Sequence, residues 1–473
     1  MPQILPGIDH LVVVMLENRS FDNILGTLYQ DAAPSFFLPE GSPTRFDGLR
    51  AGLSNPSNVG FFNGDPPQYV SVKVPAASST VPDPDPNETF ANVSYQLFGP
   101  DSPSPQPRWP MQGFLINYAT TTTGDPTQVL QCHSPEQVPV LAQLARNYAV
   151  SDAWFASVPS QTWPNRAFGH AGTSNGHVDN GSPPDPLKWD VPTIFKVLES
   201  QGVSWTVYHD TVLVPALTRT MFPSLWSVSL DGNFKSVDDF VSDCAQGNLP
   251  KYAFLEPSFL IDPNDEHPPH DVRAGEALLL RIWNALSTSR LFAKTLLVIT
   301  YDEHGGCFDH VLPPYGATPP DAGGAPGDEG FVFDRFGVRV PAVVISPYIR
   351  AGTVFRSDTQ VPYDHTSLLA TLRDWLSIPA SAMLPSQRIA KAPTLGQLLT
   401  LSVPRTDVPV ITSTLAPIHS TPTTDPPNDL QRSLVSGDAR RAGLDPGLVV
   451  GSIQTRQHAI DYFKTRAQTS SRL

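Results

Sequence analysis

The stretch that decides the fold is Ile8–Leu16 (IDHLVVVML), which is followed at once by Glu17 and Asn18. A second apolar stretch, Thr295–Tyr301 (TLLVITY), ends in the same way in Asp302 and Glu303. Continuous apolar runs of this length are typical of strands that are buried on both faces of a parallel sheet. Ligands of α/β proteins bind beyond the carboxyl ends of such strands. If the two strands lie near each other, their four polar side chains converge on one point.

These four side chains all carry oxygen. Carboxylate and amide oxygens are ligands of hard divalent cations, which favours Ca²⁺, Mg²⁺ or Mn²⁺ over Zn²⁺. Each pair also has a structural alternative, because Asn18 suits the N-cap of a following helix and strand ends often carry Asp. Two such pairs on two apolar strands are harder to explain in that way than one. The sequence therefore predicts one divalent metal ion at the carboxyl edge of the sheet.

Helical and strand patterns alternate along most of the chain. A helix is expected to start near Asn18 or Ser20 and to end at Gly26. Further helices are expected at 135–146, 194–198, 271–286 and 367–376, and further strands at 148–150, 204–208, 252–256 and 340–346. This alternation is typical of an α/β fold with a mostly parallel sheet covered on both faces.

Two parts of the chain depart from this alternation. Residues 27–130 are rich in Pro, Gly, Asn and Ser, so we expect a loop-rich insertion, or lid, over the active-site face. Residues 401–473 form a Pro-rich segment with one helix at about 454–467, which we expect to pack on the body. Residues 1–400 are then the catalytic domain. The 51 prolines suit long ordered loops, because proline is excluded from the interior of helices and strands.

Composition limits the partners. The 45 acidic residues outnumber the 31 basic ones, and no basic run stands out, which argues against nucleic-acid binding. No apolar run is long enough to cross a bilayer, and the acidic balance disfavours anionic surfaces, so membrane contact is expected to be peripheral at most. The three scattered residues Cys132, Cys244 and Cys307 give neither a disulfide framework nor a metal-binding spacing.

The N-terminus enters a strand at once, without a basic region or a cleavage site before it. We expect a cytoplasmic protein on this ground, or a secreted or periplasmic one if the chain has been trimmed. The oligomeric state is not readable from the sequence.

Thr162 is the first candidate for chemistry. It stands two residues before Pro164, which suggests a helix start, and a helix N-terminus binds phosphate through free N–H groups and its dipole. A hydroxyl held there beside a metal ion has a lowered pKa and can attack phosphorus. The alternative is an ordinary capping threonine.

Several histidines are candidates for acid–base work. His267 lies in a proline-rich loop, NDEHPPHD (264–271), where a histidine beside the carboxyl edge of the sheet suits protonation of a leaving oxygen. His304, His310 and His170 are further candidates, together with His365. For each of them singly, a hydrogen-bonded structural role is the alternative.

Taken together, the motifs resemble a known family. ENRSFD (17–22), TWPNR (162–166), DEHP (265–268) and YDEHGG (301–306), with DHV (309–311) after it, stand in order along the chain. They resemble the phosphatidylcholine-type, or non-specific, phospholipase C / acid phosphatase family, a branch of the alkaline phosphatase-like superfamily. The match runs from about residue 8 to about residue 376. Its motifs are specific because four of them occur in order.

The resemblance implies a three-layer α/β/α sandwich and a set of site residues. It implies one metal ion held by five residues: Glu17, Asn18, Thr162, Asp302 and Glu303. It also implies that Thr162 is the nucleophile and that His267 is the general acid near the phosphate. Asn165 and Arg166, which follow the nucleophile, are expected to contact the substrate.

Two positions depart from the family pattern. Family members often carry an early Pro-Asp-Pro-Gly-His-Glu stretch, whereas the similar stretch here, residues 82–88 (PDPDPNE), has no histidine. That histidine is either missing or supplied by His133 or His170. Cys307 replaces an aromatic residue that often follows Gly-Gly. Both departures bear on substrate preference more than on reaction class.

Three functions compete at this point. The first is a metal-dependent phosphoesterase of phospholipase C type that acts on phosphodiesters such as phosphatidylcholine through a phosphothreonine intermediate. The second is a broad-specificity acid phosphatase that uses the same site. The third, disfavoured by the intact motifs, is a catalytically silent binding protein. An apolar trough beside Thr162 would favour lipid; its candidate residues are Phe36, Phe37, Phe61 and Phe62, for which ordinary loop packing is the alternative.

Overall fold

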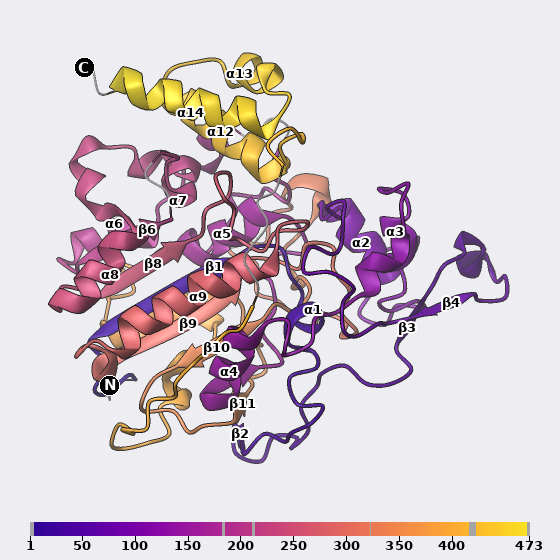
Figure 1. Ribbon diagram of the computed structural model, residues 1–473, viewed down its shortest axis with the longest axis horizontal. Coiled ribbons are helices and arrows are strands. Elements are labelled where there is room, and N and C mark those ends of the chain that lie inside the picture. Colours follow the sequence, from indigo (N-terminus) through magenta and orange to yellow (C-terminus); the bar gives the residue numbers. More distant parts are fainter. Residues whose placement is uncertain (1–3, 182–184, 211–212, 322, 416–421, 471–473) are drawn as a thin grey trace.

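The computed structural model describes residues 4–181, 185–210, 213–321, 323–415 and 422–470. A nine-stranded sheet runs through the centre of the molecule (Figure 1). From edge to edge its strands are β2 (Phe36–Leu38), β11 (Thr353–Phe355), β5 (Ala149–Ser151), β10 (Ala342–Ile345), β9 (Thr295–Tyr301), β1 (His10–Leu16), β8 (Tyr252–Glu256), β6 (Trp205–His209) and β7 (Phe234–Ser236). All neighbours pair in parallel except β10, which is antiparallel to both β9 and β5. The mostly parallel sheet is confirmed.

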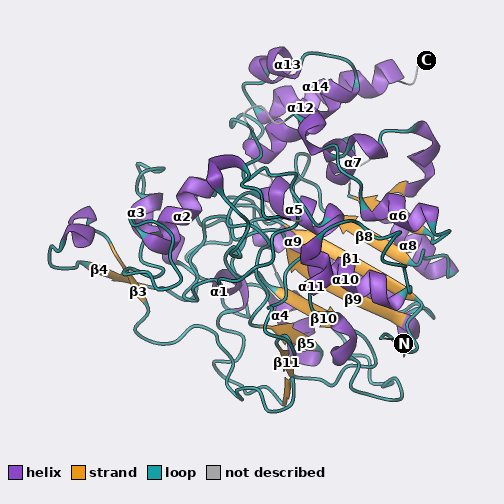
Figure 2. Ribbon diagram, turned by 180° about the vertical axis from the view of Figure 1, so that it is seen from behind, coloured by secondary structure: helices purple, strands orange, loops and turns teal. Residues whose placement is uncertain are grey.

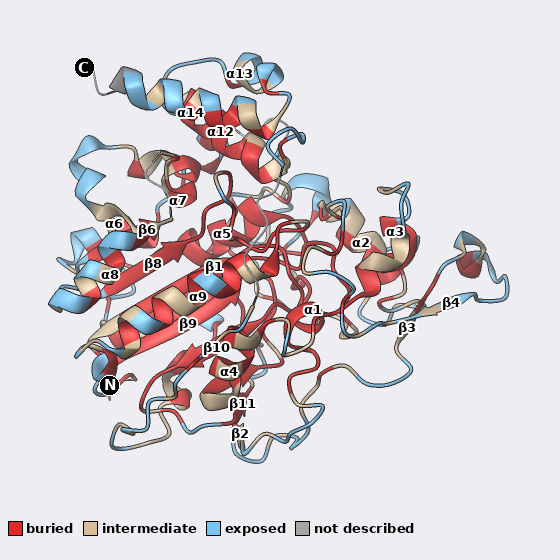
Figure 3. Ribbon diagram, in the orientation of Figure 1, coloured by how far each residue is buried: buried red, intermediate tan, exposed pale blue. Residues whose placement is uncertain are grey.

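The two decisive strands are direct neighbours. β1 and β9 pair in parallel along their full length, with His10 opposite Thr295 and Leu16 opposite Tyr301. Both strands are buried on both faces (Figure 3), which explains why their sequences are continuously apolar rather than alternating. Because the two strands end in register, the residues that follow them emerge side by side.

Helices cover both faces of the sheet. α4 (Pro139–Asn147) and α9 (Val272–Ser287) lie over one face (Figure 1), and α5 (Thr162–Ala171) and α10 (Thr366–Trp375) lie over the other (Figure 2). Further helices are α1 (Phe21–Leu25), α6 (Ile194–Ser200), α7 (Leu217–Met221), α8 (Val237–Gln246) and α11 (Gln387–Lys391). α1 starts at Ser20, whose side chain accepts the Asn23 N–H, and it ends at Gly26 as expected. The three-layer α/β/α arrangement follows from these two covers.

The region expected to be a loop-rich insertion is more regular than its sequence indicates. It contains the sheet-edge strand β2, a hairpin of β3 (Ser54–Pro56) and β4 (Tyr69–Ser71), and the helices α2 (Phe90–Phe98) and α3 (Phe114–Tyr118). These elements have three to nine residues, which is too short for a hydrophobic period to be read. Tertiary packing stabilises them, because Val93, Leu97 and Phe114 share a second apolar core.

The C-terminal part has more structure than the single helix expected at 454–467. That helix is α14 (Arg456–Ser470), and α12 (Asp429–Arg441) and α13 (Pro446–Ser452) precede it. α12 has a polar sequence, yet most of it is buried, and its Gly437 approaches Thr220 of α7 so closely that a Cβ atom would clash. Packing against α7, rather than an apolar stripe, therefore orders α12. None of the helices in the described ranges is both long and apolar enough to span a bilayer.

Candidate active site

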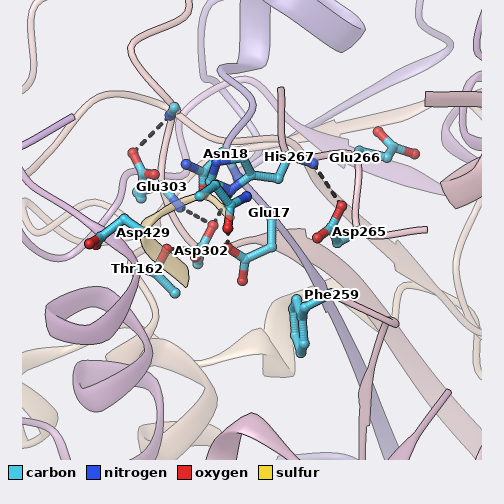
Figure 4. A network of polar contacts seen from close by, with 12 residues as sticks. Glu17, Asn18, Thr162, Phe259, Asp265, Glu266, His267, Asp302, Glu303 and Asp429 are labelled. Atoms are coloured by element: carbon cyan, nitrogen blue, oxygen red, sulfur yellow. Dashed lines mark hydrogen bonds and ion pairs between the residues drawn. The ribbon is translucent and has the colours of Figure 1, made fainter. Parts of the chain in front are cut away.

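Four polar side chains meet where β1 and β9 end, and we call Glu17, Asn18, Asp302 and Glu303 the strand-end cluster (Figure 4). All four residues are completely buried. Asn18 has a left-handed backbone (φ 53°), and its N–H donates to Asp302 Oδ1 at 3.0 Å. The Glu303 N–H donates to the same oxygen at 2.8 Å, and the Gly305 N–H donates to Glu303 Oε2 at 2.8 Å. Backbone donors thus fix one oxygen of each acid.

Both oxygens of Glu17 accept hydrogen bonds, but several other polar atoms of this cluster form none among the described residues. Among the described residues, neither side-chain atom of Asn18 forms a hydrogen bond, and neither Asp302 Oδ2 nor Glu303 Oε1 accepts one. Burial and the nearby Glu17 carboxylate raise the pKa of Asp302 to about 7, and burial and Asp302 raise the pKa of Glu303 well above its ordinary value. Buried oxygens without donors are costly unless a cation binds them, so these residues fit a divalent metal ion.

Thr162 lies against this cluster. It is the first residue of α5 and is 2% exposed, and its Oγ1 donates to Glu17 Oε2 at 3.1 Å. Pro164, at the third helical position, has no N–H, and the Trp163 N–H donates to Asn180 Oδ1 at 2.8 Å. The first turn of this helix thus places the Thr162 hydroxyl against Glu17 and leaves Trp163 paired with Asn180.

The two residues expected to contact substrate are engaged inside the protein. Arg166, one turn after Thr162 on the same face of α5, donates from Nε to Glu17 Oε1 at 2.9 Å, and this nitrogen lies 3.6 Å from Asp302 Oδ2. Asn165 holds the loop before the helix: its Oδ1 accepts from the Val158 N–H, and its Nδ2 donates to three carbonyls of that loop. Arg166 supplies a fixed positive charge under Glu17, and Asn165 shapes the turn that presents Thr162.

His267 faces the cluster from the opposite side (Figure 4). Its Nε2 is 2.8 Å from Asp85 Oδ2, whereas its Nδ1 lies 3.8 Å from Glu17 Oε2 and makes no hydrogen bond among the described residues. Burial lowers the pKa of His267, but the Asp85 carboxylate outweighs burial and raises this pKa well above its ordinary value. The ring is thus held through one nitrogen, and the other nitrogen faces the site.

The remaining histidines have other surroundings. His304 Nε2 is 2.8 Å from Gln96 Oε1 and its Nδ1 is 3.3 Å from Glu303 Oε2, so it buttresses a ligand of the proposed metal. His170 lies at the far end of α5 among Phe195, Phe222 and Phe254, and burial lowers its pKa to about 3.

His133 and His365 are also buried structural residues. Burial lowers the pKa of His133 to about 3, and its ring nitrogens lack hydrogen-bond partners among the described residues. His365 Nε2 contacts the backbone oxygen of Asp302. Neither His133 nor His170 takes the place of the missing family histidine. Instead, the PDPDPNE stretch itself reaches the site, where Asp85 contacts His267 and Glu88 contacts Gln161.

A second acidic group follows the same two strands, and we call Asp22, Asp309, His310 and Arg339 the Arg339 cluster. Ligand atoms of its two acids and His310 lie within 4.8 Å of one another, close enough to hold a metal. However, all four carboxylate oxygens already accept hydrogen bonds, from Arg339, from His310 and from backbone amides. His310, a catalytic candidate by sequence, belongs to this cluster.

Sequence reasoning missed part of the site rim. Glu88 Oε1 accepts from Gln161 Nε2 at 3.4 Å, and Asp429 of α12 accepts from Gln161 Nε2 at 3.3 Å and from Asn180 Nδ2 at 2.6 Å. Asp429 therefore braces the residue before Thr162 from the C-terminal segment. Only the PDPDPNE resemblance could have pointed to Asp85 and Glu88, and no sequence signal marks Asp429.

The four phenylalanines that were candidates for an apolar trough follow the alternative interpretation, packing within their own segments. Phe36 and Phe37 lie on the sheet-edge strand β2, whereas Phe61 and Phe62 pack with Tyr95 and Trp109 in a separate aromatic cluster. The four phenylalanines are too widely separated in the fold to line one groove beside Thr162, because their segments pack on different cores.

Comparison with known proteins decides the family. A profile described as "Phosphoesterase family" matches residues 8–379, most of the chain and all the motifs above. The chain belongs to this phosphoesterase family. It is therefore a hydrolase that acts on phosphoric ester bonds, with the α/β architecture described above.

Named relatives agree with this assignment. The chain is 33% identical to non-specific phospholipase C6 of Arabidopsis thaliana over 441 residues, which are 90% of this chain and 78% of that protein. It is 30% identical to phospholipase C B of Mycobacterium tuberculosis over 424 residues, 80% of this chain and 75% of that protein. Among solved structures, the phosphonate monoester hydrolase of Silicibacter pomeroyi covers 57% of this chain and 73% of its own, at 15% identity and a TM-score of 0.33.

Proposed function

We propose that this phosphoesterase is a metal-dependent enzyme of phospholipase C type that hydrolyses phosphodiesters such as phosphatidylcholine through a phosphothreonine intermediate. One observation carries the proposal: Thr162 Oγ1 stands 3.1 Å from Glu17 Oε2 in a buried cluster in which the Asn18 side-chain amide, Asp302 Oδ2 and Glu303 Oε1 form no hydrogen bond among the described residues. Such an arrangement combines a nucleophile with a place for a cation, which is what phosphoryl transfer requires. The names of the relatives supply the substrate class.

The metal would be held by Glu17, Asn18, Asp302 and Glu303 together with Thr162. When bound, a divalent cation neutralises charge on the phosphoryl oxygens and lowers the pKa of a hydroxyl beside it. An all-oxygen set suits Ca²⁺, Mg²⁺ or Mn²⁺ better than Zn²⁺. The charges agree, because three carboxylates against the single guanidinium of Arg166 leave two negative charges for a divalent ion to balance.

The protein's own residues then perform two displacements. Thr162 Oγ1 attacks phosphorus, its proton passing toward Glu17, and the bond from phosphorus to the leaving alcohol oxygen breaks. His267 protonates that oxygen from Nδ1, the nitrogen that Asp85 leaves free. A water molecule next attacks phosphorus and gives a proton to His267. The bond from phosphorus to Thr162 Oγ1 breaks, Glu17 returns its proton to that oxygen, and the phosphorylated head group is released.

The rim favours a diester over a monoester. Asp85, Glu88 and Asp429 lie around His267, and burial, together with Asp85 and Asp429, raises the pKa of Glu88 well above its ordinary value. Negative charge on this rim, which the Asp85 carboxylate supplies next to His267, repels a phosphomonoester dianion more strongly than a diester monoanion, and it would attract a cationic head group such as choline. This is the reason to place acid phosphatase activity second.

The test compares phosphatidylcholine with p-nitrophenyl phosphate as substrates of metal-stripped protein to which each metal has been returned. We expect diester hydrolysis to dominate and Thr162→Ala to lower kcat by about 10³-fold or more, since nucleophile removal has effects of that size. Thr295→Ala is the matched control, because Thr295 is equally buried but lies at the amino end of β9, away from the cluster. Turnover by Thr162→Ala close to that of the wild type would refute the nucleophile assignment, and dominant monoesterase activity would reverse the preference.

A further inference from the structure

The hairpin β3–β4 and the chain around it form an arm that projects from the body. We call residues 51–71 together with 108–112 the hairpin arm; both ribbon views show the hairpin extending beyond α2 and α3, away from the sheet (Figures 1 and 2). Its aromatic residues pack on one another: the ring centroids of Phe61 and Trp109 are 4.6 Å apart, and those of Phe61 and Tyr69 are 6.0 Å apart. The arm thus has its own small core.

The surface of the arm carries two exposed apolar side chains and a groove lined by aromatic rings. Val59 is 61% exposed and Tyr69 is 54% exposed, and the turn between them contains the exposed residues Pro66 and Pro67. A groove of about 430 Å³ lies beside Tyr69; Leu53, Phe61, Arg108, Trp109 and Pro110 also line it. The Arg108 guanidinium rests over the Trp109 ring at 4.5 Å. Aromatic rings with a polar edge beside an exposed arginine are typical of residues that sit at a lipid head-group layer.

The charge of the arm indicates what kind of surface it fits. The arm contains one acid, Asp65, and one base, Arg108, so it is neutral in a chain whose net charge is −14. An acidic protein with a neutral aromatic tip is repelled by anionic lipid but not by zwitterionic lipid. From this we infer that the hairpin arm docks the enzyme on a zwitterionic phospholipid surface, with Arg108 toward the phosphates and Val59 and Tyr69 in the interface.

The chain connects this surface to the catalytic centre. The segment that follows β4 leads to Asp85 and Glu88 at the site, and α2, whose Tyr95 packs on Phe62 of the arm, holds His304 through Gln96. Docking at the arm would therefore hold lipid next to the segment and the helix that connect the arm to Asp85 and His304. The inference rests on the proposed function for its substrate, but its test does not depend on turnover.

The test measures flotation of the inactive Thr162→Ala protein with phosphatidylcholine vesicles. We expect vesicle binding, and a loss of about tenfold or more when Val59→Asp and Tyr69→Ser are added. Val228→Asp is the matched control, because Val228 is 82% exposed but lies outside the arm, and it should not change binding. In the otherwise wild-type enzyme, the same arm substitutions should lower the rate of hydrolysis of vesicle lipid by a similar factor. The rate of hydrolysis of a soluble substrate, p-nitrophenyl phosphorylcholine, should stay within about twofold of the wild-type rate.

Three outcomes would overturn the inference. First, the arm variants could bind vesicles as tightly as the Thr162→Ala protein does. Second, the protein could bind only vesicles that contain anionic lipid. Third, the substitutions could change the sedimentation of the protein without lipid, which would make the arm a contact between copies of the chain. Failure of the proposed function looks different, because it would abolish hydrolysis of the soluble diester in the wild type while vesicle binding by Thr162→Ala stays measurable.

Discussion

The strand-end cluster and the Arg339 cluster follow the same two strands and are both buried, but their charges are balanced differently. In the Arg339 cluster, Asp22 and Asp309 face Arg339 and a histidine whose pKa is raised to about 9, and every carboxylate oxygen accepts a hydrogen bond. In the strand-end cluster, three carboxylates face one guanidinium, and oxygens remain without donors. A buried acidic group that is internally satisfied stabilises structure, whereas one left unsatisfied is a place for a cation.

The largest expected effect tests the strand-end cluster as the metal site. Replacing Glu303 by Gln removes one negative ligand and leaves Gly305 N–H with an acceptor, so the fold should survive. We expect one divalent ion per chain in calorimetric titration of the stripped wild type, no measurable binding by Glu303→Gln, and kcat lower by about 10²-fold or more. Two equivalent ions, or full activity after chelation, would break the distinction between the clusters.

The opposite result is expected for the Arg339 cluster. Arg339→Met leaves two buried carboxylates without their cation, which should lower the free energy of unfolding by about 3–5 kcal/mol. Chemical denaturation measures this change, and metal titration of the same variant should still give one ion if it is assayed below its transition. If Arg339→Met were as stable as the wild type but unable to bind metal, the ion would belong to the Arg339 cluster, and our assignment to the strand-end cluster would be wrong.

A pH dependence of stability should come from the same cluster. Burial lowers the pKa of His310, but hydrogen bonds to Asp22 and Asp47 outweigh burial and raise this pKa from 6.5 to about 9. A raised pKa gives stability that is complete below pH 6.5 and is lost as the pH rises through 9, so the free energy of unfolding should fall by up to about 3 kcal/mol across that window. His310→Asn should flatten the fall; an unchanged slope in this variant would assign the dependence to another group.

The smallest effect is expected at the rim. Asp429→Ala removes the acceptor of Gln161 and Asn180, the residues that hold the start of α5, and should lower kcat by a few-fold to about tenfold with little change in the melting temperature. Asp429→Asn, which keeps an acceptor oxygen, should recover most of the activity, and Asp425→Ala, at an exposed residue of the same segment, is the control. Equal losses in the alanine and asparagine variants would argue that charge, not positioning, matters there.

Much of this protein is readable from local sequence. Two continuously apolar runs predicted buried strands, and the acids at their ends predicted oxygens at one edge if the strands lay close together, because parallel strands expose the residues that follow them at the same side. The structure shows that the two strands are direct neighbours. Thr162 was placed at a helix start by the proline two residues on, which is a local rule as well. The expected helices at 135–146 and 271–286 correspond to α4 and α9 for the same reason.

What only the tertiary structure decided is how charges and short segments pair across the chain. Nothing in the local sequence distinguishes Asp302 from Asp309. In the fold, however, Arg339 donates to Asp309, whereas Asp302 and its neighbour Glu303 each keep one oxygen without a hydrogen bond among the described residues. Tertiary packing alone also decides the places of Asp85 and Asp429 in the site, and the formation of the strands that have only three residues. A hydrogen bond between residues 182 or 268 positions apart depends on where the whole chain packs, and no periodicity records it. Sequence thus determined the long apolar strands and the oxygens at their ends, and packing determined the short elements and which of those oxygens form no hydrogen bond.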